Sequence, residues 1–99
     1  MSALKSIPRD AIARLCRQYQ VRQLALFGSA VRGELRSNSD IDLLVDFEPA
    51  AQVGMLTLAR LARELGSLLG RPVDLVPRQG LKPLIRQEVL ARTEVLFAA

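Results

Sequence analysis

The stretch that decides the fold is LFGSAVRGELRSNSDIDLLVDF, residues 26–47. It begins as an apolar strand that ends in a Gly28-Ser29 turn, and it closes with a second strand that carries Asp40 and Asp42. Side chains at positions i and i+2 of a strand project from the same face, so these two carboxylates aim at one point. The apolar residues of the second strand face the opposite way, into a core: Ile41, Leu43 and Val45.

The two carboxylates indicate a cation. Ionised acids that lie this close repel each other unless a positive charge sits between them. Hard oxygen ligands suit Mg²⁺, with Mn²⁺ as a substitute. The Gly28-Ser29 turn offers backbone N–H groups, a hydroxyl and a helix N-terminus, which suit the phosphates of a nucleotide. The stretch therefore predicts a metal-dependent nucleotide site.

The spacing Gly28-Ser29-x10-Asp40-x-Asp42 resembles the signature of the DNA polymerase beta nucleotidyltransferase superfamily. The whole run over residues 26–47 is similar to its smallest branch, the minimal nucleotidyltransferases of HEPN/MNT toxin–antitoxin pairs. The likeness in length and element order covers almost the entire chain. It implies an α/β (α+β) nucleotidyltransferase fold, in which a small mixed β-sheet of three to four strands is flanked by helices.

Helices are expected where apolar residues recur with helical spacing. They are a first helix that begins at Ile7-Pro8, one or two turns after Ser29, a long helix over residues 53–69 that Gly70 closes, and a last helix that begins at Pro83. Strands are expected over residues 23–27, 40–47 and 71–77, with residues 93–97 as either a short edge strand or a flap. The resulting order is α-β-α-β-α-β-α.

Size and charge limit the classes of protein. Ninety-nine residues predict one domain, 1–99, with a single core. The net charge of +4, with twelve arginines among fourteen basic residues, favours anionic partners. The arginines are scattered and aromatic residues are few, so direct binding of nucleic acid on stacked aromatics is not expected. The absence of histidine excludes Ser-His-Asp and Cys-His hydrolysis and histidine zinc sites.

Cys16 is the only cysteine, which rules out an intramolecular disulfide and fits a reducing cytoplasm. It lies on the apolar stripe of the first predicted helix and no histidine can activate it, so we interpret it as a small buried hydrophobe. No apolar run approaches the roughly 18 residues of a membrane span, and no secretion signal is apparent. We therefore expect a cytoplasmic protein without a membrane partner.

Asp74 lies in the third predicted strand, where Val73 and Leu75 share one face and leave the acid on the other. An acid in an apolar strand is costly to bury unpaired, so a salt bridge with an arginine such as Arg71 is one interpretation. The superfamily resemblance implies another. It calls for a third carboxylate that reaches the metal site from a neighbouring strand, and Asp74 is the acid in the right kind of element.

The expected reaction is transfer of a nucleoside monophosphate from a triphosphate, with ATP as co-substrate, to a hydroxyl, with release of pyrophosphate. Two Mg²⁺ ions, which Mn²⁺ could replace, would be held by Asp40, Asp42 and Asp74. These three acids are the expected catalytic residues. Gly28 and Ser29 would cradle the β- and γ-phosphates, because a glycine lets the backbone approach closely.

Other polar residues of the same stretch have less defined roles. Ser39 is a candidate for a hydroxyl on the phosphates, and Arg32 or Arg36 for a charge on the leaving pyrophosphate. For the arginines, a solvated surface is the competing interpretation. Asp46 and Glu48, next along the second strand, we assign to solvent or to the strand end.

A minimal catalytic core must take its acceptor hydroxyl from a partner. The resemblance implies an antitoxin that adenylylates a tyrosine on a cognate HEPN ribonuclease toxin, the product of an adjacent gene. Two alternatives stay open: a catalytically silent antitoxin that acts by stoichiometric binding, and a nucleic-acid-binding module with an accidental motif. The sequence does not decide the preferred base or the oligomeric state, for which a homo-oligomer is one option.

Overall fold

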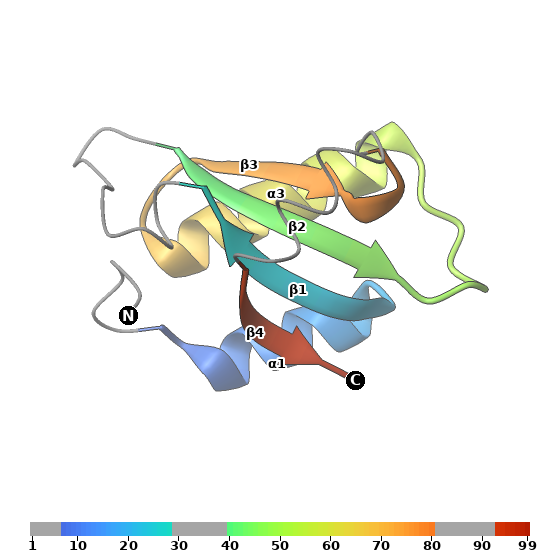
Figure 1. The fold of residues 1–99 in the computed structure, drawn as a ribbon, viewed down its shortest axis with the longest axis horizontal. Coiled ribbons are helices and arrows are strands. Elements are labelled where there is room, and N and C mark those ends of the chain that lie inside the picture. Colours follow the sequence, from blue (N-terminus) through green and yellow to red (C-terminus); the bar gives the residue numbers. More distant parts are fainter. Residues whose placement is uncertain (1–6, 29–39, 81–92) are drawn as a thin grey trace.

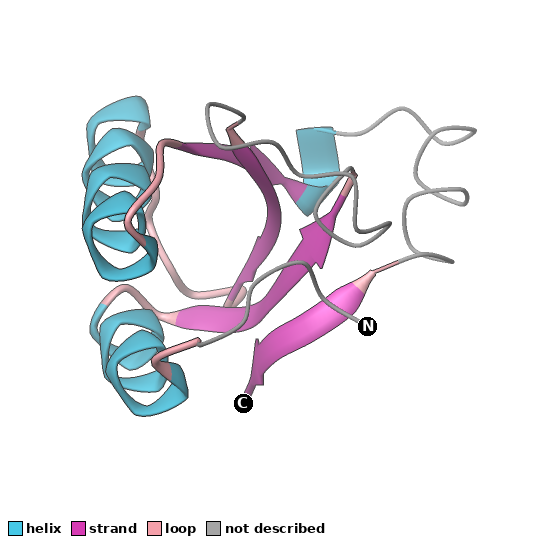
Figure 2. Ribbon diagram, turned by 90° about the vertical axis from the view of Figure 1, so that its left-hand side faces the viewer, coloured by secondary structure: helices cyan, strands magenta, loops and turns pink. Residues whose placement is uncertain are grey.

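The structure is a computed structural model that describes residues 7–28, 40–80 and 93–99. In these ranges a four-stranded sheet carries two α-helices on one face (Figures 1 and 2). The strands are β1 (Val21–Phe27), β2 (Ile41–Phe47), β3 (Val73–Pro77) and β4 (Glu94–Ala98). The helices are α1 (Arg9–Gln18) and α3 (Met55–Leu69), and a 3₁₀ turn, η1 (Arg78–Gly80), follows β3.

The strands lie in the order β3-β2-β1-β4. β1 runs antiparallel to both β2 and β4, whereas β2 runs parallel to β3. Two parallel neighbours need a long crossover, and the segment containing α3 supplies it. The mixed sheet of four strands confirms the predicted fold class, and β4 shows that the C-terminal apolar segment is an edge strand, not a flap.

The predicted end of the long helix is confirmed. Gly70 adopts a left-handed conformation with φ +72°, and its N–H donates to the carbonyl oxygen of Gly66 at 2.8 Å. This geometry satisfies a carbonyl that the helix end would otherwise leave unpaired. The helix starts at Met55, two residues later than the pattern predicts, because Gly54 before it is extended.

The core lies between the helices and one face of the sheet. Its most deeply buried side chains come from α1, β1, β2 and α3: Ile12, Cys16, Leu24, Leu26, Ile41, Leu43, Leu61 and Leu65. Each such aliphatic side chain contributes about 1.5–3 kcal/mol through burial. Burial also raises the pKa of the Cys16 thiol to about 11, which agrees with its interpretation as an inert hydrophobe.

Because Ile41 and Leu43 of β2 face this core, the strand alternation leaves Asp42, Leu44 and Asp46 on the opposite face of β2.

Two of the predicted helices cannot be compared with the structure. The helical turns predicted after Ser29 and the helix predicted from Pro83 lie outside the described residues. Tyr19, directly after α1, packs against the core and donates a hydrogen bond to Glu64 at 2.5 Å, which ties α1 to α3. In the described ranges, neither helix has the length and apolar character needed to cross a bilayer.

Candidate active site

The Gly28 backbone lies directly against the Asp42 carboxylate. Phe27, the last residue of β1, pairs with Asp42 across the antiparallel ladder, and Gly28 follows with φ +75°. A Cβ atom built on Gly28 would lie 2.5 Å from Asp42 Oδ2 and 3.3 Å from its Cγ. Glycine is therefore needed twice here, for the left-handed backbone and for the space beside the acid.

Asp74 lies on the same face of the sheet as Asp42. β2 and β3 run parallel with Asp42 opposite Asp74, and residues opposite each other in neighbouring strands project to the same side. Leu75 is buried toward the helices, whereas Asp74 is exposed. Because Asp74 is exposed, no burial cost forces it into a salt bridge with Arg71.

The acids act on one another electrostatically. The pKa of Asp42 is raised above its ordinary value, first by burial, then by the charge of Asp74 and then by the charge of Asp40. Asp40 stands just before β2 and is exposed. The charges of Asp74 and Asp40 therefore both act on Asp42, and a cation would relieve this repulsion.

The residues fit a divalent cation by donor chemistry and by shared face. Carboxylate oxygens are the ligands that Mg²⁺ and Mn²⁺ prefer. Over residues 7–28, 40–80 and 93–99, no three or more His, Cys, Asp or Glu side chains are already grouped closely enough to hold a metal ion. Asp40 and Asp74 are exposed, and their side chains would have to turn toward Asp42 to form a set of ligands with it.

Of the residues predicted to bind the nucleotide, Gly28 is described and lies against the Asp42 side chain, and its phosphate contact stays a prediction. Ser29, Arg32, Arg36 and Ser39 lie outside the described residues, so their roles stay predictions.

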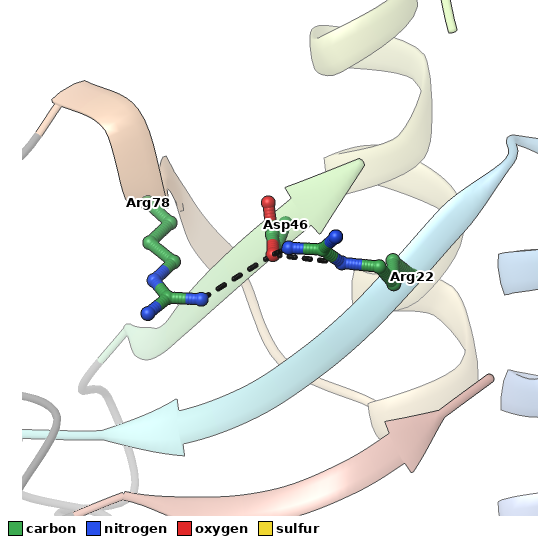
Figure 3. Close-up of polar contacts among 3 residues, drawn as sticks. All are labelled: Arg22, Asp46 and Arg78. Carbon is green, nitrogen blue, oxygen red and sulfur yellow. Dashed lines mark hydrogen bonds and ion pairs between the residues drawn. The ribbon is translucent and has the colours of Figure 1, made fainter. Parts of the chain in front are cut away.

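The assignment of Asp46 to solvent is wrong. Asp46 is 8% exposed, and its Oδ2 accepts hydrogen bonds from Arg22 Nη2 at 2.6 Å and Nε at 3.2 Å (Figure 3). Arg78 Nη1 lies 3.4 Å from the same oxygen. A charge can be buried when it is paired and hydrogen-bonded in this way. A bulge between Val21 and Gln23 lies at Arg22, and bulges commonly re-aim a side chain.

The sequence held a signal for this cluster. Arg22 stands at the start of β1 and Arg78 directly follows Pro77 at the end of β3, so both flank the strand that carries Asp46. The order of the strands was needed to see it, because the three residues are far apart in the chain.

Comparisons with known proteins identify the family of this chain. Residues 9–96 match the family described as Nucleotidyltransferase domain, a range that contains all the candidate site residues. The chain is 43% identical over 90 residues to Protein adenylyltransferase MntA of Thermococcus cleftensis, which covers 91% of this chain and 89% of that protein.

Two solved structures extend the likeness. One is a toxin–antitoxin with AMP-PNP, with a TM-score of 0.75 and 28% identity, covering 94% of this chain and 75% of that one. The other is a tri-AMPylated HEPN toxin of Shewanella oneidensis in complex with an MNT antitoxin, with a TM-score of 0.65 and 26% identity. That match covers 92% of this chain and 70% of the other.

Proposed function

Because the chain belongs to the nucleotidyltransferase domain family and is a nucleotidyltransferase, we propose that it transfers AMP from ATP to a tyrosine of a cognate HEPN ribonuclease toxin. The observation that supports this most strongly is the register that sets Asp42 opposite Asp74, with Gly28 against Asp42. The relative from Thermococcus cleftensis is a protein adenylyltransferase, and a HEPN toxin in one similar structure is AMPylated. Both support AMP as the transferred group and a protein as the acceptor, and the second supports a HEPN toxin as that protein.

In this proposal Asp40, Asp42 and Asp74 hold two Mg²⁺ ions. Bound ions of this kind lower the pKa of an attacking hydroxyl and neutralise charge on the triphosphate. The chain's own groups hold and orient the reactants. Gly28 leaves room for the phosphates to approach the backbone, and Ser29 donates its hydroxyl to them.

The transfer is a single displacement at the α-phosphorus. The tyrosine oxygen forms a bond to that phosphorus, the bond from the phosphorus to the bridging oxygen breaks, and pyrophosphate leaves. Asp74, the exposed acid of the pair, accepts the proton of the tyrosine hydroxyl. Arg32 and Ser39 are proposed to contact the triphosphate and the leaving pyrophosphate.

The test is incubation with ATP labelled at the α-phosphate, Mg²⁺ and the product of the adjacent gene. We expect covalent label on a tyrosine of that partner, and none with the Asp40→Ala variant. Asp10→Asn is the matched control, because Asp10 is an exposed acid in the first turn of α1. Failure of all four nucleoside triphosphates to label the partner would overturn the proposal.

A second candidate is neutralisation by stoichiometric binding, with transfer playing no part in the biological effect. One observation favours it: the described carboxylates are not already grouped closely enough to hold a metal. The two candidates differ in the effect of Asp42→Asn on toxin neutralisation in cells. Loss of neutralisation supports transfer, and full neutralisation by this variant supports binding alone.

A further inference from the structure

Asp46, Arg22 and Arg78, here called the Asp46 cluster, lie one short step along the strands from the candidate active site. Asp46 lies four residues after Asp42 on β2, and Arg78 lies four residues after Asp74 on the chain that leaves β3. The β2–β3 ladder ends with Val45 opposite Pro77, so the Asp46–Arg78 ion pair forms at the next step. The ion pair thus forms in the same register that sets Asp42 opposite Asp74.

β3 has few other features that fix this register. Among the described strands, β3 is an edge strand of five residues that pairs with β2 alone, and Leu75 is its one buried residue. Its last residue, Pro77, has no N–H to donate to the ladder. A slip by two residues would keep every side chain on its own face, so the hydrophobic pattern opposes it only weakly. At the other end, Ile41 N–H donates to the Pro72 carbonyl at 2.9 Å.

We propose that Arg78 is a positioning residue, which pins the end of β3 to the buried Asp46 carboxylate and so keeps Asp74 beside Asp42. The inference rests on the proposed function, since it is Asp74 at the metal site that needs the position. Asp46 is the fixed point of this contact, because its side chain is only 8% exposed.

The two arginines of the cluster have separable roles. Arg22 comes from β1, approaches Asp46 at 2.6 Å and keeps the buried charge paired, but it belongs to no strand that carries Asp74. Arg78 comes from the β3 side and approaches at 3.4 Å (Figure 3). Arg22 should therefore matter more for stability, and Arg78 more for the geometry of the acids. A purely structural cluster would give the same order in both measurements.

The experiment compares Arg78→Gln with Arg22→Gln, the matched control from the same cluster. Binding of Mn²⁺ is measured by electron paramagnetic resonance in the presence of ATP, and stability by urea unfolding. We expect Arg78→Gln to weaken Mn²⁺ binding roughly 10-fold, the lower limit of what loss of a residue that orients metal ligands costs, and to show the smaller loss of stability. We expect Arg22→Gln to lose more stability and to bind Mn²⁺ like the wild type. Arg78→Lys should restore part of the Mn²⁺ affinity.

A second measurement needs neither metal nor activity. In the metal-free protein, nuclear Overhauser effects between the backbones of residues 42 and 74 should weaken in Arg78→Gln and persist in Arg22→Gln. Equal effects of both variants, or wild-type contacts and Mn²⁺ affinity in Arg78→Gln, would overturn the positioning role. A wild-type protein that binds no Mn²⁺ with ATP would instead overturn the proposed function, and the backbone contacts would still decide the role of Arg78.

Discussion

Asp42 and Asp46 are the same residue type on the same face of one strand, yet the fold treats them in opposite ways. Asp46 is buried and paired with two guanidinium groups from β1 and η1. Asp42 lies beside two further acids, and in the described part of the chain it has no ion pair. Within the described residues, the protein thus neutralises Asp46 with its own arginines and does not do so for Asp42. Of the two acids, Asp42, which has no ion pair among the described residues, is therefore the better candidate for a functional role.

The difference also assigns a direction to the energetics. Burying a paired carboxylate costs desolvation, which attraction to its partners offsets, so removal of one partner destabilises. Like charges held close together oppose folding, so removal of one of them raises the free energy of unfolding. Substitutions at the two ends of this face should therefore separate activity from stability.

The largest expected effect is on catalysis. Asp42→Asn should lower the rate of AMP transfer by on the order of 10³-fold, because a metal ligand contributes several kcal/mol to transition-state stabilisation. Asp46→Asn should lower it only about 10-fold, through misplacement of Asp74. Initial rates with labelled ATP at saturating Mg²⁺ measure both. Equal losses of transfer rate in the two variants would contradict the assignment of different roles to Asp42 and Asp46.

The next effect compares two glycines. Gly28→Ala places a Cβ atom 2.5 Å from Asp42 Oδ2 at φ +75°, so we expect a stability loss of about 1–3 kcal/mol together with loss of transfer activity. Gly70→Ala is the matched control, because Gly70 has φ +72° but nothing within 4 Å of an added Cβ atom. It should lose about 1 kcal/mol and keep its activity. Urea unfolding and the transfer assay check both variants.

Much of this arrangement is readable from the sequence because it depends on local rules. Alternation along β2 places Asp42 opposite its apolar neighbours, and the Gly70 stop follows from helical periodicity. Asp74 follows from the resemblance together with an alternation that frees its side chain from the core. Each of these inferences needs only the residues of one element or one motif.

The Asp46 cluster was missed because it is a property of the sheet and not of a strand. Alternation places Asp46 on the same face as Asp42 and so predicts the same exposure. Its burial depends on partners at positions 22 and 78, which come together only once β1 and β3 are known to flank β2. The bulge at Arg22 adds a change of direction that no period-2 pattern contains.

A third effect is on stability at the paired end. Asp46→Asn keeps the volume of the side chain but leaves Arg22 and Arg78 without their buried carboxylate, so we expect a loss of roughly 1–3 kcal/mol in the free energy of unfolding. Both arginines are partly exposed and can turn to water, which keeps the loss at this level. Urea unfolding of the metal-free protein measures it. A variant as stable as the wild type would mean that the ion pairs contribute nothing net.

The smallest effect has the opposite sign and belongs to the unpaired end. The folded protein raises the pKa of Asp42 above 3.8, so its protonated form favours folding, and this contribution is lost as the pH rises through the folded pKa. At pH 7 the ionised group therefore opposes folding, and Asp42→Asn should stabilise the metal-free protein. Asp42 is only partly buried, so screening by solvent keeps the gain below about 1 kcal/mol.

The gain should vanish near pH 3, where Asp42 is protonated in both states, and urea unfolding in EDTA across this range measures it. Asp74→Asn should show a gain of the same sign at pH 7, because it removes a charge that raises the pKa of Asp42. Mg²⁺ should then make the wild type more stable than Asp42→Asn. An ion that binds the folded protein stabilises it, and it should bind more weakly to the variant that lacks the Asp42 carboxylate. A wild type more stable than Asp42→Asn in EDTA at pH 7 would show that the fold has already satisfied Asp42, and the contrast with Asp46 would no longer single out a ligand site.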